Sequence, residues 1–116
     1  MKKIALEEAF APSDMGKHLY KNLVNSEMKQ LKADLADLTG QRLRIMDRCD
    51  VSQMVLSLTS PGMEGVADLK KAPALAAQWN DHLCEGIHQH RDRLKGFACL
   101  PMADPEAAAQ ELRRAV

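Results

Sequence analysis

The chain has 116 residues, which is room for one small domain and no more. Its 16 basic residues balance 16 acidic ones, so the formal net charge is zero and neither a nucleic-acid surface nor a polybasic membrane patch is expected. Hydrophobic residues make up 46% and charged residues 28%, which excludes a disordered chain.

The first apolar run, residues 3–6, predicts a strand. After a loop, a helix is expected to begin with Ser26 as its N-cap and to carry apolar residues at helical spacing up to Gly40. One or two further helical turns are then expected, up to Asp50. The next run, residues 53–58, is nearly continuous in apolar residues, the pattern of a strand that is covered on both faces.

A long helix is predicted over residues 70–90, because four apolar residues form one stripe: Leu75, Trp79, Leu83 and Ile87. Pro73 falls in its first turn, where a missing N–H costs little. The third strand is expected at residues 96–100. Asp104 then has the features of an N-cap, and Pro105 those of a first helical residue.

This β-α-β-α-β-α order predicts an α/β fold with parallel strands and right-handed helical crossovers. Residues 1–116 then make up three of the eight units of a (β/α)8 barrel, which is incomplete in this chain. A flavodoxin-like or Rossmann half has the same order, but no Gly-rich loop follows the first strand, which argues against a dinucleotide site. Three strands leave two open edges, so pairing with a second copy, a homo-oligomer, is expected.

The apolar runs are shorter than the roughly 20 residues that a membrane helix needs. Glu7 and Glu8 interrupt the stretch that a signal peptide would require. Cys49, Cys84 and Cys99 are an odd number without close spacing, which is typical of buried thiols in a reducing compartment. The sequence therefore predicts a cytoplasmic protein without a membrane segment.

Functional groups of parallel α/β folds gather at the carboxyl ends of the strands. Glu7 follows the first strand and shares a face with Ala9, and its carboxylate is an oxygen ligand suited to a divalent metal. A solvated loop is the alternative. Thr59, Ser60 and Pro61 follow the second strand, where they are candidates to line a pocket, although the same residues are also ordinary turn formers.

His88 and His90 look like a metal-binding pair, but residues two apart on a helix point about 200° apart and do not share one ion. Cys84 and His88 are four apart, yet two further ligands at suitable spacing are missing, so zinc is not predicted there. No Ser-His-Asp arrangement can be argued, and the phosphate-binding loop motif is absent.

Several blocks of the chain, in order, resemble the amidohydrolase-related, metal-dependent decarboxylases, which include γ-resorcylate, dihydroxybenzoate and carboxyvanillate decarboxylases. These blocks are IALEEAFA (4–11), RLRIMD (42–47), MVLSLTSPG (54–62), NDHL (80–83), DRLKGFACLP (92–101) and DP (104–105). The similarity covers essentially the whole chain apart from residues 12–25. Several ordered blocks make this resemblance far more specific than any single motif.

The resemblance implies a (β/α)8 barrel that holds one divalent metal (Zn, Mn or Mg) and acts on a small aromatic carboxylic acid with an ortho hydroxyl. Glu7 matches the family's metal-binding glutamate, and Ala9 stands where some members place a histidine ligand. Hydrolytic amidohydrolases need His-x-His here, so Glu7-x-Ala9 favours decarboxylation over hydrolysis. Positions near the substrate pocket correspond to Ala9, Phe10, Thr59, Ser60 and Pro61.

In that family the aspartate that protonates the ring and the histidine ligands come from later strands, beyond Val116. The chain then holds no catalytic residue and at most one metal ligand, so we expect an N-terminal fragment of a carboxy-lyase that is inactive alone. Asn80 and Asp81 match a recurring helix pair, which we interpret as structural. Two alternatives stay open: a non-catalytic α/β assembly module that pairs through its sheet edges, and an amidohydrolase-type, metal-dependent hydrolase.

Overall fold

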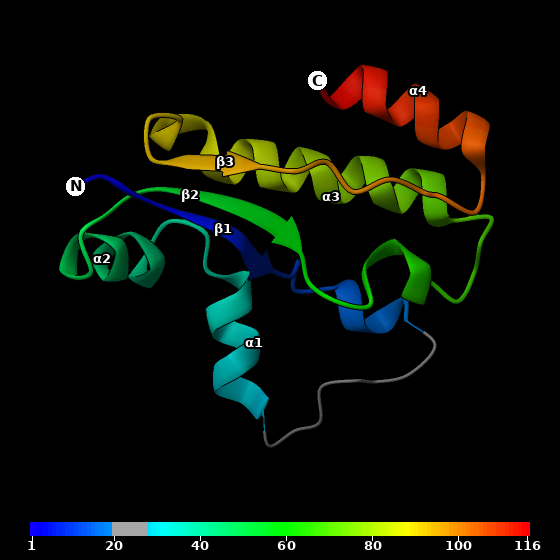
Figure 1. Ribbon diagram of the computed structural model, residues 1–116. Helices are drawn as coiled ribbons and strands as arrows, with labels where there is room; N and C mark the ends of the chain where they lie inside the picture. The colour runs from blue at the N-terminus through cyan, green and yellow to red at the C-terminus, as the bar shows by residue number, and fades with distance from the viewer. Residues whose placement is uncertain (20–27) are drawn as a thin grey trace.

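The computed structural model describes residues 1–19 and 28–116, which form a three-stranded sheet in the order β1-β2-β3 (Figure 1). Strand β1 spans Lys3–Phe10, β2 spans Val51–Leu58 and β3 spans Leu94–Gly96. Both neighbouring pairs are parallel. The predicted α/β class with parallel strands is therefore confirmed.

Helices follow each strand in the described ranges. The α-helices are α1 (Lys29–Ala36), α2 (Gln41–Arg48), α3 (Ala72–Ile87) and α4 (Pro105–Ala115). Short 3-10 helices occupy Met15–Lys17, Gly62–Gly65 and His88–His90. The expected N-cap Ser26 lies outside the described residues. None of the helices described is both long and apolar enough to cross a membrane.

Helix α3 agrees with the predicted pattern over most of its length. Pro73 lies in its first turn, and Leu75, Trp79 and Leu83 are buried along one face. The α-helix ends at Ile87, three residues earlier than predicted, and continues as a single 3-10 turn. A glycine, a poor helix former, occupies the last turn before this change.

The third strand is shorter than predicted and lies earlier in the chain, at Leu94–Gly96 instead of residues 96–100. The Phe97 N–H still donates to a β2 carbonyl at 2.9 Å, but residues 97–100 then continue as irregular chain. The pairing of β2 with β3 ends at Leu56 and Gly96, although β2 itself continues to Leu58. The Asn80 side chain binds the Cys99 backbone in place of a strand.

The helices cover one face of the sheet, and two clusters of buried side chains fill the space between them. The first cluster lies between the sheet and helices α2 and α3: Phe10, Leu38, Met46, Met54, Leu56, Leu83 and Leu94. The second lies where the segments after β1 and β2 meet α3: Met15, Met63, Val66, Ala72, Leu75, Ala76 and Trp79. Helix α4 packs on α3 and not on the sheet (Figure 1).

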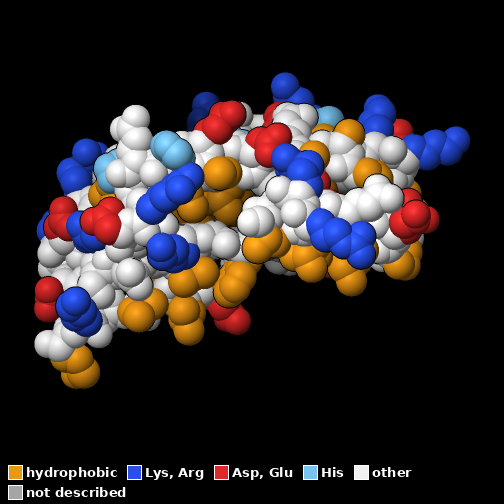
Figure 2. Space-filling view, turned by 90° about the horizontal axis from the view of Figure 1, so that it is seen from above, with side chains coloured by type: hydrophobic (Ala, Val, Ile, Leu, Met, Phe, Trp, Pro, Cys, Tyr) orange, Lys and Arg blue, Asp and Glu red, His pale blue; other side chains and the backbone are white. Residues whose placement is uncertain are grey.

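No helix or strand within residues 1–19 and 28–116 covers the opposite face of the sheet. Ile4 is 57% exposed, Leu6 65% and Phe97 58%, although all three are large apolar residues. Figure 2 shows hydrophobic side chains gathered along one margin of the molecule. In a closed barrel this face of the sheet would line the interior. An unclosed barrel would therefore expose apolar side chains here.

The cysteines differ from the expectation of three buried thiols. Cys49 and Cys84 are exposed, and Cys99 is partly buried. Cys49 directly follows the last residue of α2, and Cys84 lies next to Leu83 on the outward side of α3. The prediction was wrong for these two residues because an odd, widely spaced set of cysteines says nothing about which helix face each one takes.

Candidate functional site

A β-bulge interrupts β1 at Glu7. The pairing with β2 passes from Ala5 to Glu8 on β1 while β2 advances only from Met54 to Leu56, so β1 contains one extra residue. Glu7 has a φ of 61°, in the left-handed region that non-glycine residues seldom adopt. Such a conformation costs of order 1 kcal/mol or more and persists only where the surrounding structure holds it.

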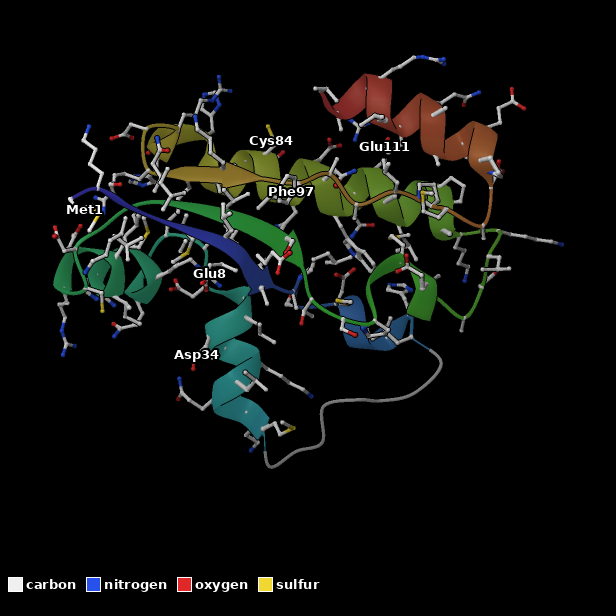
Figure 3. All side chains as sticks on the ribbon, in the orientation of Figure 1. Met1, Glu8, Asp34, Cys84, Phe97 and Glu111 are labelled. Carbon is white, nitrogen blue, oxygen red and sulfur yellow. The ribbon has the colours of Figure 1, made fainter. Side chains whose placement is uncertain are left out.

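This bulge decides which side of the sheet the following side chains take. Phe10, which pairs with Leu58, is 2% exposed and lies in the core on the helix-covered side. Glu8 lies on that side as well, toward α1 and α2 (Figure 3). Ala9 alternates to the uncovered face, and the exposed Glu7 precedes it.

The carboxyl ends of β1 and β2 are joined through the backbone. The Thr59 N–H donates to the Phe10 carbonyl oxygen at 2.8 Å, and the Gly62 N–H donates to the Thr59 carbonyl oxygen at 2.8 Å. The second bond closes a turn that contains Ser60 and Pro61, and Gly62 fits there because its φ is 64°. The structure thus brings the predicted site residues of both strands to one edge of the sheet.

A cavity of about 570 Å³ opens beside this edge. Thr59 and Ser60 line it together with Ala11, the segment that follows β1, and part of α1. Lys17 and Lys32 are among its lining residues, and most of the lining surface is apolar.

The structure does not bring every predicted residue to that cavity. Among the described residues that line it, Glu7, Ala9, Phe10 and Pro61 are not found. Phe10 contributes through its carbonyl oxygen, because its ring is enclosed in the core. By alternation from Phe10, Ala9 takes the uncovered side of the sheet, where the interior of a closed barrel would lie, and Glu7 is exposed.

Sequence reasoning assigned no role to Asp37 and Arg42, which lie beside this edge. The Asp37 carboxylate accepts hydrogen bonds from the Gly40 and Arg42 backbone N–H groups, each at 2.8 Å, and so caps the start of α2. The Arg42 side chain donates from Nη2 to the Ala9 carbonyl oxygen at 2.9 Å. Asp37 stands three residues before Gly40, where α2 begins, and this spacing could have indicated the cap from the sequence.

Asp14 fastens the segment after β1 to helix α3. Its carboxylate accepts from Trp79 Nε1 at 3.3 Å and from Gln78 Nε2 at 3.1 Å, and His18 Nε2 lies 3.6 Å away. The two contacts with α3 join residues 64 and 65 positions apart, and no local pattern in the sequence could have indicated them. They position one wall of the cavity relative to the core.

Metal-ligating side chains do not cluster across residues 1–19 and 28–116. No three or more His, Cys, Asp or Glu side chains in these ranges come together as a metal-binding group. His88 Nδ1 lies 2.7 Å from Arg91 Nη2, which donates to it. The described residues therefore offer Glu7 as a single carboxylate donor rather than a complete set of ligands.

Three parallel strands, helices on one face and polar groups after β2 define an open sheet of the parallel α/β class. Residues 13–116 match the amidohydrolase family (Amidohydro_2), and the chain belongs to this family.

Known relatives are similar over nearly the whole chain. The γ-resorcylate decarboxylase of Polaromonas sp. (strain JS666) is 39% identical over 114 residues, which are 98% of this chain and 35% of that protein. The crystal structure of 2,6-dihydroxybenzoate decarboxylase from Rhizobium has a TM-score of 0.87 and 36% identity, and the match covers 100% of this chain and 35% of that one.

Two further solved structures contain manganese. Dihydroxybenzoic acid decarboxylase from Polaromonas sp. JS666, with manganese and the inhibitor 2-nitroresorcinol, has a TM-score of 0.85 and 38% identity over 99% of this chain and 35% of that one. The 5-carboxyvanillate decarboxylase of Novosphingobium aromaticivorans has a TM-score of 0.84 and 28% identity over 97% and 38%. The chain thus spans about a third of the length of these relatives.

Proposed function

We propose that the protein carrying this chain is a metal-dependent carboxy-lyase for ortho-hydroxylated aromatic acids, and that residues 1–116 contribute three units of its barrel. The observation that carries this proposal is the bulge in β1, where Glu7 is exposed three residues before the strand ends, in a chain of this family. The decarboxylases to which the chain is similar support the choice of reaction.

In this proposal Glu7 supplies one oxygen ligand to a divalent metal, Zn, Mn or Mg. A carboxylate suits all three ions, and the remaining donors come from outside the described residues. The bound ion would hold the substrate's carboxylate and ortho hydroxyl and balance the charge that develops during the reaction. The proton donor to the ring is likewise proposed to lie outside this chain.

The residues of this chain then bind and orient the acid. We assign the substrate contacts to the hydroxyl groups of Thr59 and Ser60, with Pro61 fixing the turn that presents them. The small side chain of Ala9 leaves space on the uncovered face, and the Phe10 carbonyl oxygen holds Thr59 in place.

The test is release of carbon dioxide from 2,6-dihydroxybenzoate in the presence of Mn²⁺ by the complete protein. Glu7→Gln should lower kcat/KM by about 100-fold or more, because it removes a metal ligand while keeping the side chain's size. Glu85→Gln, an exposed position on α3, is the control and should retain activity. Full activity of Glu7→Gln would overturn the proposal.

The 116-residue chain should be inactive alone under the same conditions. Turnover above that of a Glu7→Ala control would contradict this expectation, since it would mean that the described donors suffice. Hydrolysis of an ester or amide without loss of carbon dioxide would instead favour the hydrolase alternative, against which Glu7-x-Ala9 argues.

The uncovered sheet face favours one further candidate, a non-catalytic assembly module. Ile4, Leu6 and Phe97 are exposed there, and β1 and β3 each have one edge without a described partner strand. Sedimentation velocity separates the two functions. A discrete, folded homodimer without bound metal supports assembly, whereas aggregation or partial unfolding of the isolated chain supports part of a barrel.

A further inference from the structure

We infer that Arg42 is a positioning residue that holds the carboxyl end of β1, and with it the Glu7 carboxylate, in the orientation needed at the site. The expected effect of Arg42 on metal binding rests on the function proposed above. The positioning of β1 by Arg42 does not, because the bonds between α2 and β1 exist in this chain without any ligand.

The Arg42 guanidinium joins three parts of the fold. Nη2 donates to the Ala9 carbonyl oxygen at 2.9 Å, on the strand that carries the bulge. Nε donates to the Asp37 carbonyl oxygen at 2.9 Å, and Nη2 reaches the Asp34 carbonyl oxygen at 3.4 Å, so the same group binds the free carbonyls at the end of α1. Nη1 lies 3.6 Å from the Met54 sulfur on β2.

The position of Arg42 is itself fixed by the capping of α2. Asp37 binds the backbone N–H groups of Gly40 and Arg42, and a Cβ at Gly40 would lie only 2.6 Å from the Asp37 Oδ1. The guanidinium is partly removed from water, which lowers its pKa from the usual value, while the charges of Asp37 and Glu8 favour its protonated form. Arg42 is therefore a partly buried charged group with several hydrogen-bond partners.

The bond to Ala9 matters because the preceding residues are strained. Glu7 has a left-handed backbone, and a conformation of this kind is retained only if the chain on either side is held. Two restraints act just after it: Arg42 on the Ala9 carbonyl, and the Leu35 carbonyl, which accepts from the Ala11 N–H at 2.9 Å. Both come from the α1–α2 region, so this region sets the direction in which β1 ends.

Lysine cannot replace this arrangement, because one ammonium group does not present several N–H donors in a fixed plane. Arg42→Lys keeps the charge and the flexible stem but should lose the bonds to Ala9 and to the end of α1. Arg44→Lys is the matched control, since Arg44 is exposed on the same helix and its side chain bonds only to Gln41 within the described residues.

The experiment measures two quantities on the complete protein. Without metal, amide hydrogen exchange at Ala11 and Thr59 should become about 10-fold faster or more in Arg42→Lys and stay unchanged in Arg44→Lys. Affinity for Mn²⁺ alone should fall by about 10-fold or more in Arg42→Lys only. Unchanged exchange together with unchanged Mn²⁺ affinity would overturn the inference.

A third readout needs no variant, which covers the case in which Arg42→Lys does not fold. In the unmodified protein the guanidinium protons of Arg42 should exchange with water more slowly than those of Arg44, as observed by NMR. Equal exchange would overturn the inference. If Glu7→Gln leaves Mn²⁺ affinity intact while Arg42→Lys still loosens Ala11, the proposed function fails and the positioning role of Arg42 stands.

Discussion

The side-chain amide of Asn80 binds the backbone of Cys99 on both sides. Its Nδ2 donates to the Cys99 carbonyl oxygen at 2.9 Å, and its Oδ1 accepts from the Cys99 N–H at 2.8 Å. The same Nδ2 donates to Oε1 of the buried Glu111 at 2.7 Å. One side chain on α3 therefore holds the chain after β3 and connects it to α4, which agrees with the structural role expected for Asn80.

Replacing Asn80 by alanine should destabilise the protein by about 2–4 kcal/mol, because three hydrogen bonds are lost and Glu111 keeps one buried oxygen with fewer partners. Urea unfolding measures the change. His82→Ala, an exposed position on the same helix, is the control and should change stability by less than about 0.5 kcal/mol. Equal stability of the two variants would contradict the role assigned to Asn80.

Glu111 should make stability depend on pH in the acid range. The hydrogen bond from Arg114 is the main cause that holds the pKa of Glu111 below its ordinary 4.5; burial opposes it, and the bond from Asn80 adds to it. A lowered pKa in the folded state means that the stabilisation is complete above pH 4.5 and is lost as the pH falls through that lower value.

Glu111→Gln should therefore flatten the acid side of the stability curve, measured by urea unfolding from about pH 7 to about pH 3. Glu106→Gln, exposed in the first turn of α4, serves as the comparison and should leave the acid dependence largely in place. An unchanged acid dependence in Glu111→Gln would show that Glu111 does not carry it.

Gly65→Ala should destabilise the turn that carries Thr59 and Ser60. A Cβ at Gly65 would overlap the Pro61 ring, a rigid group that has no alternative rotamer to adopt. We expect a loss of about 1–3 kcal/mol in thermal or urea unfolding. Glu64→Ala, an exposed neighbour in the same 3-10 helix, should stay within about 0.5 kcal/mol; a similar loss there would point to the 3-10 helix and not to this contact.

Cys99 should react slowly with alkylating reagents. Burial raises the pKa of its thiol to about 11 from an ordinary 9.0, which reduces the thiolate at a given pH about 100-fold. With iodoacetamide at about pH 8, mass spectrometry should find Cys49 and Cys84, which are exposed, modified first. Modification of Cys99 at the rate of Cys84 would contradict this prediction.

Local patterns predicted the elements that depend on nearby residues. Asp104 caps α4 as expected, with Oδ1 accepting from the Ala107 N–H at 3.0 Å, and Pro73 lies in the first turn of α3. The nearly continuous apolar run over residues 53–58 lies within β2. The apolar run after Gly96 was misplaced as a strand, because hydrophobicity does not reveal whether a backbone partner exists.

The candidate site was predictable in part. The sequence predicted that Glu7 follows a strand over residues 3–6, but β1 continues to Phe10, so Glu7 lies inside the strand at the bulge. The Thr59–Pro61 turn does follow β2, and the Thr59–Phe10 hydrogen bond joins the ends of the two strands. The bulge was not predictable, because it is defined by the register of β1 against β2 and not by the residues of β1 alone. Phe10 was expected near the substrate, yet its ring lies in the core on the side that this bulge selects.

The order of residues by itself determined the parallel α/β class, the start of α4 and the family, since spacing, capping residues and matching blocks are all local properties of a chain. Only the tertiary structure decided the backbone conformation and the long-range contacts of the site. These are the left-handed Glu7, the Arg42 bond to Ala9 and the Asp14 contact with Trp79. These depend on residues distant in sequence that meet only after the sheet and helices have packed, and a linear pattern does not record such distances.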